Sequence, residues 1–484
     1  MKILLASSEA HPYSKTGGLA DMVGALAKAL VGEGHQVGLV TPLYTGIREL
    51  FPAIRRLDWN LELSLGPNLV RGEVWTLQPH ERLTVYLIDQ PGFYLRPSPY
   101  QQDGVDYPDN AERFIFLSKA VVHLARYLPW QPELVHVHDW QVGLVPLFIQ
   151  HEKLATGWGT APRTCMTIHN LAYQGIFPAS RYPLTNLPWD YFNPNGVEFY
   201  KLFNCLKAGI TYANAITTVS PRYAREITTE EFGCGLDALL RYRQKALIGI
   251  LNGVDYDDWN TTHNPFLRHP YSIKDLSGKN ANKLELQKEL GLPADPKIPV
   301  FASISRLVEQ KGVDIQLGAL EEMLSANLQF VLLGSGASPF ERGYRRLVQR
   351  YPSKAAIRFG YDQGLAHRIE AGSDFFLMPS RFEPCGLSQM YSLRYGTVPI
   401  VRVTGGLDDT VIDATESPKS ANGIKFMEYS SRSLAKSIRK ALALYAEPEL
   451  LRHYQLNGMA ADFSWDRTAL DYTSLYQRTL KKSR

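Results

Sequence analysis

Short apolar runs, each followed by a polar or glycine-rich turn, recur along almost the whole chain and constrain its fold more than any other feature. In the first half these runs cover residues 2–6, 37–42, 84–89, 133–139, 164–169 and 215–220. Helical patterns separate several of the runs; after the first one, apolar residues recur at helical spacing at Leu19, Val23, Leu26 and Leu30. This alternation predicts an α/β protein with doubly wound parallel sheets. Ligands of such sheets bind beyond the carboxyl ends of the strands, so the polar residues that end each run are candidate site residues.

The pattern pauses after residues 246–255 and starts again at 299–307, which indicates a second domain. Its predicted strands are residues 300–304, 330–333, 357–359, 374–378 and 398–403. A chain of 484 residues is long enough for two large α/β domains. We therefore predict two Rossmann-like domains, residues 1–248 and 249–484, that face each other across a cleft. We expect the last helix to pack back on the first domain.

Composition excludes several classes of protein. With 45% hydrophobic and 21% charged residues, the chain resembles an ordinary folded protein. The net charge of +4 is scattered apart from a basic cluster at residues 481–484, and no basic stripe interleaved with aromatic residues indicates nucleic-acid binding. No apolar run approaches the ~18 residues of a membrane span, and the first run is too short for a secretory signal. The 4 cysteines contain no C-x-x-C pair, so neither a zinc site nor a disulfide framework is indicated, and we expect a cytoplasmic protein.

Lys15, Gly17 and Gly18 occupy the turn between the first predicted strand and the first predicted helix, in the segment S-K-T-G-G-L-A-D. Adjacent glycines at a helix start let a ligand approach the backbone, and the free N–H groups there favour an anion. The lysine precedes the glycines and the G-x-x-x-x-G-K spacing is absent, so this is not a Walker A loop. A tight turn with a solvated lysine explains the same residues equally well.

Two turns of the second domain carry charge just after predicted strands. Arg306 and Lys311 lie in S-R-L-V-E-Q-K-G, where two cations could neutralise a diphosphate leaving group. Glu383 lies in P-S-R-F-E-P-C-G-L-S-Q, where a buried carboxylate could bind sugar hydroxyls or stabilise positive charge. Cys385 in the same turn is a weak candidate for a nucleophile, because nothing in the sequence places a base beside it. Taken singly, each charged residue is more commonly a surface charge.

A set of motifs occurs along the chain in one order: K-T-G-G-L-A-D, H-V-H-D-W, T-I-H-N-L-A-Y-Q-G, L-N-G-V-D, S-R-L-V-E-Q-K-G, P-S-R-F-E-P-C-G-L and V-T-G-G-L-D-D-T-V. Together they resemble the bacterial glycogen synthases and plant starch synthases of glycosyltransferase family 5, over roughly residues 1–475. The resemblance implies a GT-B fold, which has two Rossmann-like domains around a cleft. It also implies extension of an α-1,4-glucan at its non-reducing end from ADP-glucose, with release of ADP and retention of the anomeric configuration.

The resemblance also implies roles for single residues. The implied catalytic residues are Lys15, Asp139, His169, Arg306, Lys311 and Glu383. Arg306 and Lys311 match the pair that neutralises the diphosphate, and Glu383 matches the carboxylate that binds the glucosyl unit. Asp139 matches an essential acidic residue, and His169 matches a histidine beside the transferred glucose.

The implied donor-binding residues are Gly17, Gly18, Asp21, Asn252, Tyr361, Cys385, Gly386, Leu387 and Ser388. Among them, Tyr361 matches the ring that stacks on adenine, and Asn252 matches a glucose contact. Ser388 departs from the threonine usual in bacterial members but keeps a hydroxyl for a phosphate contact. Tyr94, Trp140 and Tyr173 lie in turn-rich segments and are candidate acceptor contacts through stacking on glucose rings.

The family favours front-face attack, in which the acceptor O4 approaches as ADP leaves and the leaving phosphate accepts the proton. It also implies that the transfer needs no metal and no cofactor beyond the substrate ADP-glucose. The alternative from the residues alone is a metal site, since His136 and His138 project to one face of a strand, with Asp139 adjacent and His169 after the next strand.

Three other functions compete with this interpretation. A different retaining GT-B transferase would use UDP-glucose, although the K-T-G-G and E-P-C-G-L turns argue against it. A non-catalytic glucan-binding relative would have no use for cations at a leaving group. A Rossmann dehydrogenase is weaker still, because Gly334-Ser335-Gly336 lacks the third glycine of the dinucleotide fingerprint.

Overall fold

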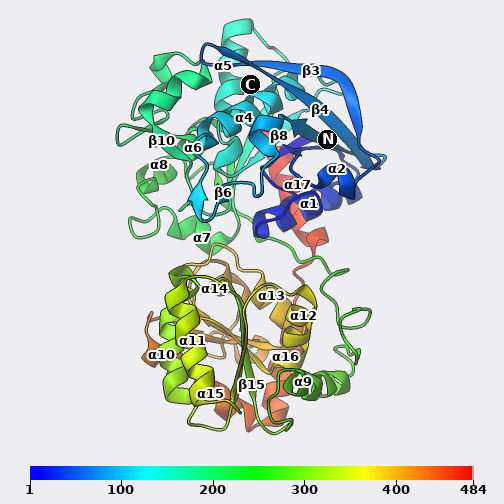
Figure 1. Ribbon diagram of the computed structural model, residues 1–484, viewed down its shortest axis with the longest axis vertical. Helices are drawn as coiled ribbons and strands as arrows, with labels where there is room; N and C mark the ends of the chain where they lie inside the picture. Colours follow the sequence, from blue (N-terminus) through cyan, green and yellow to red (C-terminus); the bar gives the residue numbers. More distant parts are fainter. Residues whose placement is uncertain (482–484) are drawn as a thin grey trace. The chain divides into compact units, whose positions relative to one another are not determined.

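The computed structural model describes residues 1–481, which form two compact units (Figure 1). Unit 1 contains residues 1–219 and 224–253 together with the described residues from Trp465 on, and unit 2 contains residues 220–223 and 254–464. The chain therefore passes into unit 2 after Gly253, slightly beyond the limit predicted from the sequence, and returns to unit 1 at Trp465. Apart from Lys481, the basic cluster of the tail lies outside the described residues.

Unit 1 is built on a nine-stranded sheet in the order β14-β13-β9-β8-β1-β2-β5-β4-β3. Its strands are β1 Lys2–Ala6, β2 Gln36–Pro42, β3 Arg55–Leu65, β4 Asn68–His80, β5 Leu83–Asp89, β8 Leu134–His138, β9 Arg163–Ile168, β13 Ala215–Thr218 and β14 Leu247–Gly249. Outside this sheet, β6 Gln101–Gln102 pairs with β7 Val105–Asp106. A small three-stranded sheet in the order β10-β12-β11 contains β10 Ile176–Pro178, β11 Glu198–Phe199 and β12 Leu202–Asn204.

The helices within residues 1–253 are α1 Gly18–Gly32, α2 Ile47–Leu50, α3 Pro91–Tyr94, α4 Asn110–Tyr127, α5 Val145–Thr156, α6 Cys205–Tyr212, α7 Pro221–Glu226 and α8 Asp237–Tyr242. The predicted amphipathic pattern buries Val23, Leu26 and Leu30 of α1. The last described helix, α17 Trp465–Lys481, belongs to unit 1, where the Tyr476 hydroxyl lies 2.7 Å from Nδ1 of His136 on β8.

The parallel sheet predicted for the first domain is only part of the observed one. Strands β14 to β5 are parallel, but β4 pairs antiparallel with β5 and β3 antiparallel with β4 at the sheet edge. Many β3 and β4 side chains remain exposed, so neither strand forms the continuous apolar run that marks a strand buried on both faces. The apolar pattern of the sequence therefore does not predict this hairpin.

Unit 2 contains a six-stranded parallel sheet in the order β17-β16-β15-β18-β19-β20. Its strands are β15 Val300–Ile304, β16 Gln329–Leu333, β17 Ala355–Arg358, β18 Phe375–Met378, β19 Val398–Arg402 and β20 Ile424–Phe426. Its helices are α9 Ser277–Glu289, α10 Val313–Met323, α11 Ser338–Arg350, α12 Gln363–Gly372, α13 Ser388–Arg394, α14 Gly405–Thr410, α15 Ser431–Tyr445 and α16 Pro448–Ala460.

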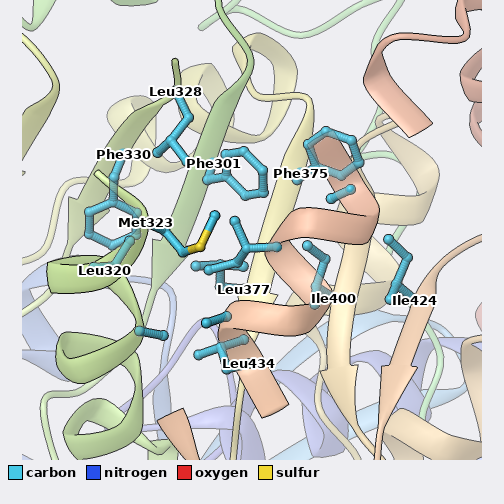
Figure 2. Close-up of a cluster of buried hydrophobic side chains, with 14 of the residues drawn as sticks. Phe301, Leu320, Met323, Leu328, Phe330, Phe375, Leu377, Ile400, Ile424 and Leu434 are labelled. Carbon is cyan, nitrogen blue, oxygen red and sulfur yellow. The ribbon is translucent and has the colours of Figure 1, made fainter. Parts of the chain in front are cut away.

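Alternate residues of the unit 2 strands form two cores, one on each face of the sheet. Phe301, Phe330 and Phe375 pack on one face with residues of α10, α11 and α15 (Figure 2). Their neighbours Ala302, Val331 and Phe376 pack on the other face with residues of α9 and α12. Burial of both faces requires helices on both sides of a parallel sheet, which is the doubly wound arrangement. No helix in residues 1–481 combines the length and apolar character needed to cross a bilayer.

Candidate active site

The glycine-rich loop of unit 1 leaves β1 and enters α1 at Gly18. Lys15 Nζ lies 2.8 Å from a carboxylate oxygen of Asp21, and both side chains are partly exposed. A Cβ built at Gly17 would meet no atom within 4 Å, so no neighbouring protein atom requires glycine there. The open space beside Gly17 and the start of α1, where the helix dipole is positive, suit an anionic ligand.

Asp139 and His169 follow the neighbouring parallel strands β8 and β9. The backbone of Asp139 adopts φ 61°, a left-handed conformation that costs energy for a residue other than glycine and is concentrated at functional sites. Its Oδ1 accepts the His169 N–H at 2.7 Å, and His169 Nε2 lies 3.1 Å from His138 Nδ1.

Burial disfavours the charged forms of both side chains, so it raises the pKa of the Asp139 carboxyl group and lowers the pKa of the His169 imidazole. Removal from water raises the pKa of Asp139 to about 7, although amide donors from His169 and Asn170 oppose the rise. Burial also lowers the pKa of His169 to about 3. Near neutral pH the imidazole is therefore uncharged, while the carboxyl group can gain or lose a proton.

The proposed metal ligands do not gather around one point. His136 and His138 lie on one strand face as predicted, with ring centroids 4.1 Å apart. His136, however, uses both ring nitrogens, since Nδ1 lies 2.7 Å from the Tyr476 hydroxyl and Nε2 lies 2.6 Å from Thr167 Oγ1. Within residues 1–481 no three His, Cys, Asp or Glu side chains are arranged to hold a metal ion.

In unit 2, Lys311 and Glu383 are brought into direct contact although they are 72 residues apart. Lys311 Nζ donates to Glu383 Oε2 at 2.6 Å, and the Ser380 hydroxyl donates to the same oxygen at 3.0 Å. Glu383 is buried, whereas Arg306 is exposed and has no carboxylate partner among the described residues. Unit 2 thus holds one cation paired with a buried carboxylate and one free to bind an anion.

The turn that carries Glu383 is packed tightly by the V-T-G-G-L-D-D-T-V motif. Gly405 has φ 45°, and a Cβ there would lie 1.8 Å from the Glu383 carbonyl oxygen. A Cβ at Gly406 would lie 2.0 Å from the Cys385 carbonyl oxygen. Only glycine fits at these two positions, so the motif has a structural reason that the sequence alone did not reveal.

The other predicted donor residues differ in burial and in backbone geometry. Gly386 adopts φ 69°, Leu387 caps α13 and Ser388 is its first residue, while Cys385 is buried. Tyr361 follows β17 and is 78% exposed. Asn252 of unit 1 is buried, and its Oδ1 has no hydrogen-bond partner among the described residues.

The structure corrects one acceptor prediction. Tyr94 is completely buried and its hydroxyl donates to the Arg113 carbonyl, so its ring cannot stack on a glucose unit. Trp140 is partly exposed, and its ring is held by edge contacts with Phe114 and Phe177. Tyr173 is 54% exposed and remains a candidate.

Sequence reasoning missed two polar residues that hold the candidate groups. Ser380 bonds Glu383, and Glu9 accepts hydrogen bonds from Thr16 inside the glycine-rich loop. Both follow a strand within three residues of its end, Glu9 after β1 and Ser380 after β18. A polar residue shortly after a buried strand is the sequence signal that marks both positions.

Comparison with known proteins identifies the family of the chain. Residues 2–242 match the family model of the starch synthase catalytic domain, and residues 283–458 match that of glycosyl transferases group 1. The chain is 47% identical over 482 residues to a glycogen synthase of Anaeromyxobacter sp. (strain Fw109-5), covering 99% of both chains. It is 44% identical over 490 residues to glycogen synthase 2 of Nitrosococcus oceani, covering 99% of this chain and 98% of the relative.

Two solved structures extend the comparison. The catalytic domain of starch synthase IV from Arabidopsis thaliana, bound to ADP and acarbose, superposes with a TM-score of 0.90 at 34% identity, covering 99% of each chain. A sucrose-phosphate synthase from Thermosynechococcus elongatus has a TM-score of 0.61 at 18% identity over 99% of each chain, which is a similarity of fold alone. The predicted family and two-domain α/β fold class are therefore confirmed: the chain belongs to the glycogen and starch synthase family of glycosyltransferases, with the GT-B architecture.

Proposed function

We propose that this chain extends α-1,4-glucan at its non-reducing end by transferring glucose from ADP-glucose and releasing ADP. Two independent likenesses support the assignment: relatives that match it from end to end are glycogen synthases, and its structural neighbour was bound to ADP and acarbose. One observation in the molecule supports the assignment most directly. Lys311 contacts Glu383, while Arg306, in the same segment after β15, has no carboxylate partner among the described residues.

In this proposal the unit 2 cations act on the leaving group. When the bond between the anomeric carbon and the phosphate oxygen breaks, negative charge develops on that oxygen. Arg306 offers a planar fork of donors and Lys311 a compact charge, and both stabilise the departing ADP. Glu383 holds Lys311 in place before the donor binds and accepts hydrogen bonds from sugar hydroxyls.

The unit 1 residues are assigned to sugar and phosphate contacts. Lys15 and the open backbone at Gly17 and Gly18 suit an anionic oxygen. The uncharged His169 imidazole can donate or accept a hydrogen bond to a sugar hydroxyl without a charge penalty. Asp139 can accept a hydrogen bond from a hydroxyl in the same region of unit 1.

The expected transfer retains the anomeric configuration. The acceptor O4 forms its bond to the anomeric carbon on the face from which ADP departs, and the O4 proton moves to the leaving phosphate oxygen. No protein general base is then required. Time-resolved proton NMR of the first product should give the small anomeric coupling of an α-linkage; a β-linked product would contradict retention.

Incubation of the purified protein with labelled ADP-glucose and a maltooligosaccharide or glycogen primer tests the activity. We expect label in the glucan and stoichiometric ADP, with UDP-glucose a much poorer donor. Preference for UDP-glucose would assign the chain to a different donor class, and absence of transfer from either donor would make it a glucan-binding relative.

We further propose that the transfer needs no metal ion. Both cations required at the leaving group are side chains, Arg306 and Lys311. Activity should survive excess EDTA after dialysis, whereas loss of activity that added Mg²⁺ or Mn²⁺ restores would refute this. The cytoplasmic location and the absence of nucleic-acid partners stay predictions from the sequence.

A further inference from the structure

The buried carboxylate of Glu9 lies three residues beyond the end of β1 and is 3% exposed. It accepts hydrogen bonds from the Thr16 backbone N–H and from the Thr16 hydroxyl, the latter at 2.8 Å to one oxygen and 3.0 Å to the other. The Tyr100 hydroxyl donates to the same carboxylate at 2.8 Å and also lies 2.7 Å from the Ser8 hydroxyl. A carboxylate this deeply buried is stable only when such donors satisfy it.

Thr16 stands between Lys15 and Gly17, so its two bonds fix the centre of the glycine-rich loop. The ends of the loop are fixed separately by backbone bonds, from Ser14 to the Ala10 carbonyl and from His11 to the Ala20 carbonyl. At Gly17 itself the protein makes no packing contact with the position of a Cβ. The Glu9 carboxylate therefore restrains the middle of the loop, between Lys15 and the open backbone at Gly17.

We infer that Glu9 is a positioning residue for glucosyl transfer, which holds Lys15 and the Gly17–Gly18 backbone in the binding geometry through Thr16. The inference rests on the proposed function, because the loop is taken to contact the donor. Glu9 itself touches no reacting atom in this account. A loop that is fixed before the donor arrives loses less conformational freedom on binding and keeps its contacts aligned as charge develops.

Glu9→Gln is the first test. It keeps the size of the side chain but replaces one carboxylate oxygen, which accepts hydrogen bonds, by an NH2 group, which only donates them. Misplacement of a catalytic loop by about 1 Å can cost on the order of 10²-fold in rate. We expect kcat with ADP-glucose to fall about 10- to 100-fold. Thr16→Val should give a similar loss, and Thr16→Ser, which keeps the hydroxyl, should restore most of the rate.

Glu133→Gln is a matched control. Glu133 also accepts a backbone N–H, that of Lys2 at 2.8 Å, but at the opposite end of β1. Its substitution should leave kcat unchanged. If Glu133→Gln lowers kcat as much as Glu9→Gln, the effect is general destabilisation and the positioning role is overturned.

Hydrogen exchange measured by mass spectrometry on residues 10–20 separates the inference from the proposed function. We expect Glu9→Gln and Thr16→Val to increase hydrogen exchange in this segment, while exchange in the β1 and β8 peptides stays unchanged. If the two variants exchange faster but the wild-type protein transfers no glucose, the loop restraint is supported and the proposed function is rejected. Unchanged exchange, or a Glu9→Gln enzyme with wild-type kcat, would overturn the inference even if transfer from ADP-glucose is observed.

Discussion

At the scale of single residues, the contact between Lys311 and Glu383 is the most informative feature of the molecule. A half-buried ammonium group held at 2.6 Å from a buried carboxylate is already oriented before any substrate binds. Because the two side chains pair with each other, neither is an ordinary surface charge. The sequence alone leaves that alternative open. The expected role in the reaction can be tested at each position separately.

Lys311→Ala should lower kcat by about 10²–10³, because it removes a preorganised cation from the developing phosphate charge. The KM for ADP-glucose should change much less, since the interaction strengthens in the transition state. Steady-state kinetics with varied ADP-glucose measures both. Lys297→Ala is the control, because Lys297 is exposed and precedes β15 at its opposite end. Unchanged turnover in Lys311→Ala would count against the leaving-group role.

Asp139 should make stability depend on pH. Its folded pKa of about 7 lies above the ordinary aspartate pKa of 3.8, so between these pH values the folded protein binds more protons than the unfolded chain. Stability from this group is therefore fully present below pH ~4 and falls as the pH rises towards 7, by at most about 1.4 kcal/mol per pH unit.

Asp139→Asn removes this dependence while keeping an oxygen for the His169 amide. We expect the variant to melt at a higher temperature than the wild-type protein above pH 7, and the difference to shrink towards pH 4. Thermal melting from pH 4 to 9 checks the sign. A difference in melting temperature that stays constant across this range would contradict the raised pKa.

At the scale of elements, the two double-glycine segments that start α1 and α14 are glycine-rich for different reasons. Gly405→Ala places a methyl group against the Glu383 carbonyl at a left-handed position, and we expect a loss of several kcal/mol with a clear drop in melting temperature. Gly17→Ala places its methyl group in open space at φ −163°, so its melting temperature should not change.

The activity of the two glycine variants completes this test. Gly17→Ala should still lose transfer activity, because the methyl group takes the space left for the donor. A Gly17→Ala enzyme with full activity would show that the open backbone is not used. Equal melting temperatures of Gly405→Ala and the wild-type protein would contradict the packing described for the Glu383 turn.

The returning helix α17 offers a further test at this scale. Tyr476 is fully buried and its hydroxyl lies against the His136 ring, whose other nitrogen bonds Thr167. Tyr476→Phe leaves a buried ring nitrogen without its partner and should cost about 1–3 kcal/mol of stability. Differential scanning calorimetry measures it, with Leu470→Ala on the exposed side of the helix as the control. Equal effects of both changes would contradict a specific role for the His136 contact.

Element prediction succeeded where the physical signal is local. The first strand of each domain is predicted at its observed limits, 2–6 and 300–304, because both are buried on two faces and bounded by polar turns. The strand expected at 357–359 begins earlier, at Ala355, since two small alanines give a weak apolar signal. The β3–β4 hairpin was missed because its partly exposed strands carry no continuous apolar run.

At the scale of the whole molecule, the order of the motifs predicted the family, which the comparisons confirm. What the sequence did not predict depends on contacts between distant segments. Tyr94 lies in a turn-rich segment but is fully buried, with its hydroxyl bonded to the Arg113 carbonyl. Glu9 follows the first apolar run, and its bonds to Thr16 in the glycine-rich loop were not predicted. Such partners are set by tertiary packing, which no local spacing encodes.

The proposed chemistry requires Arg306 and Lys311 to bind the diphosphate of the donor. A crystal structure of the protein with ADP tests it most directly. We predict that nitrogen atoms of both side chains lie within about 3.2 Å of phosphate oxygens, with Tyr361 stacked on the adenine ring. ADP bound with both cations away from its phosphates would contradict the claim.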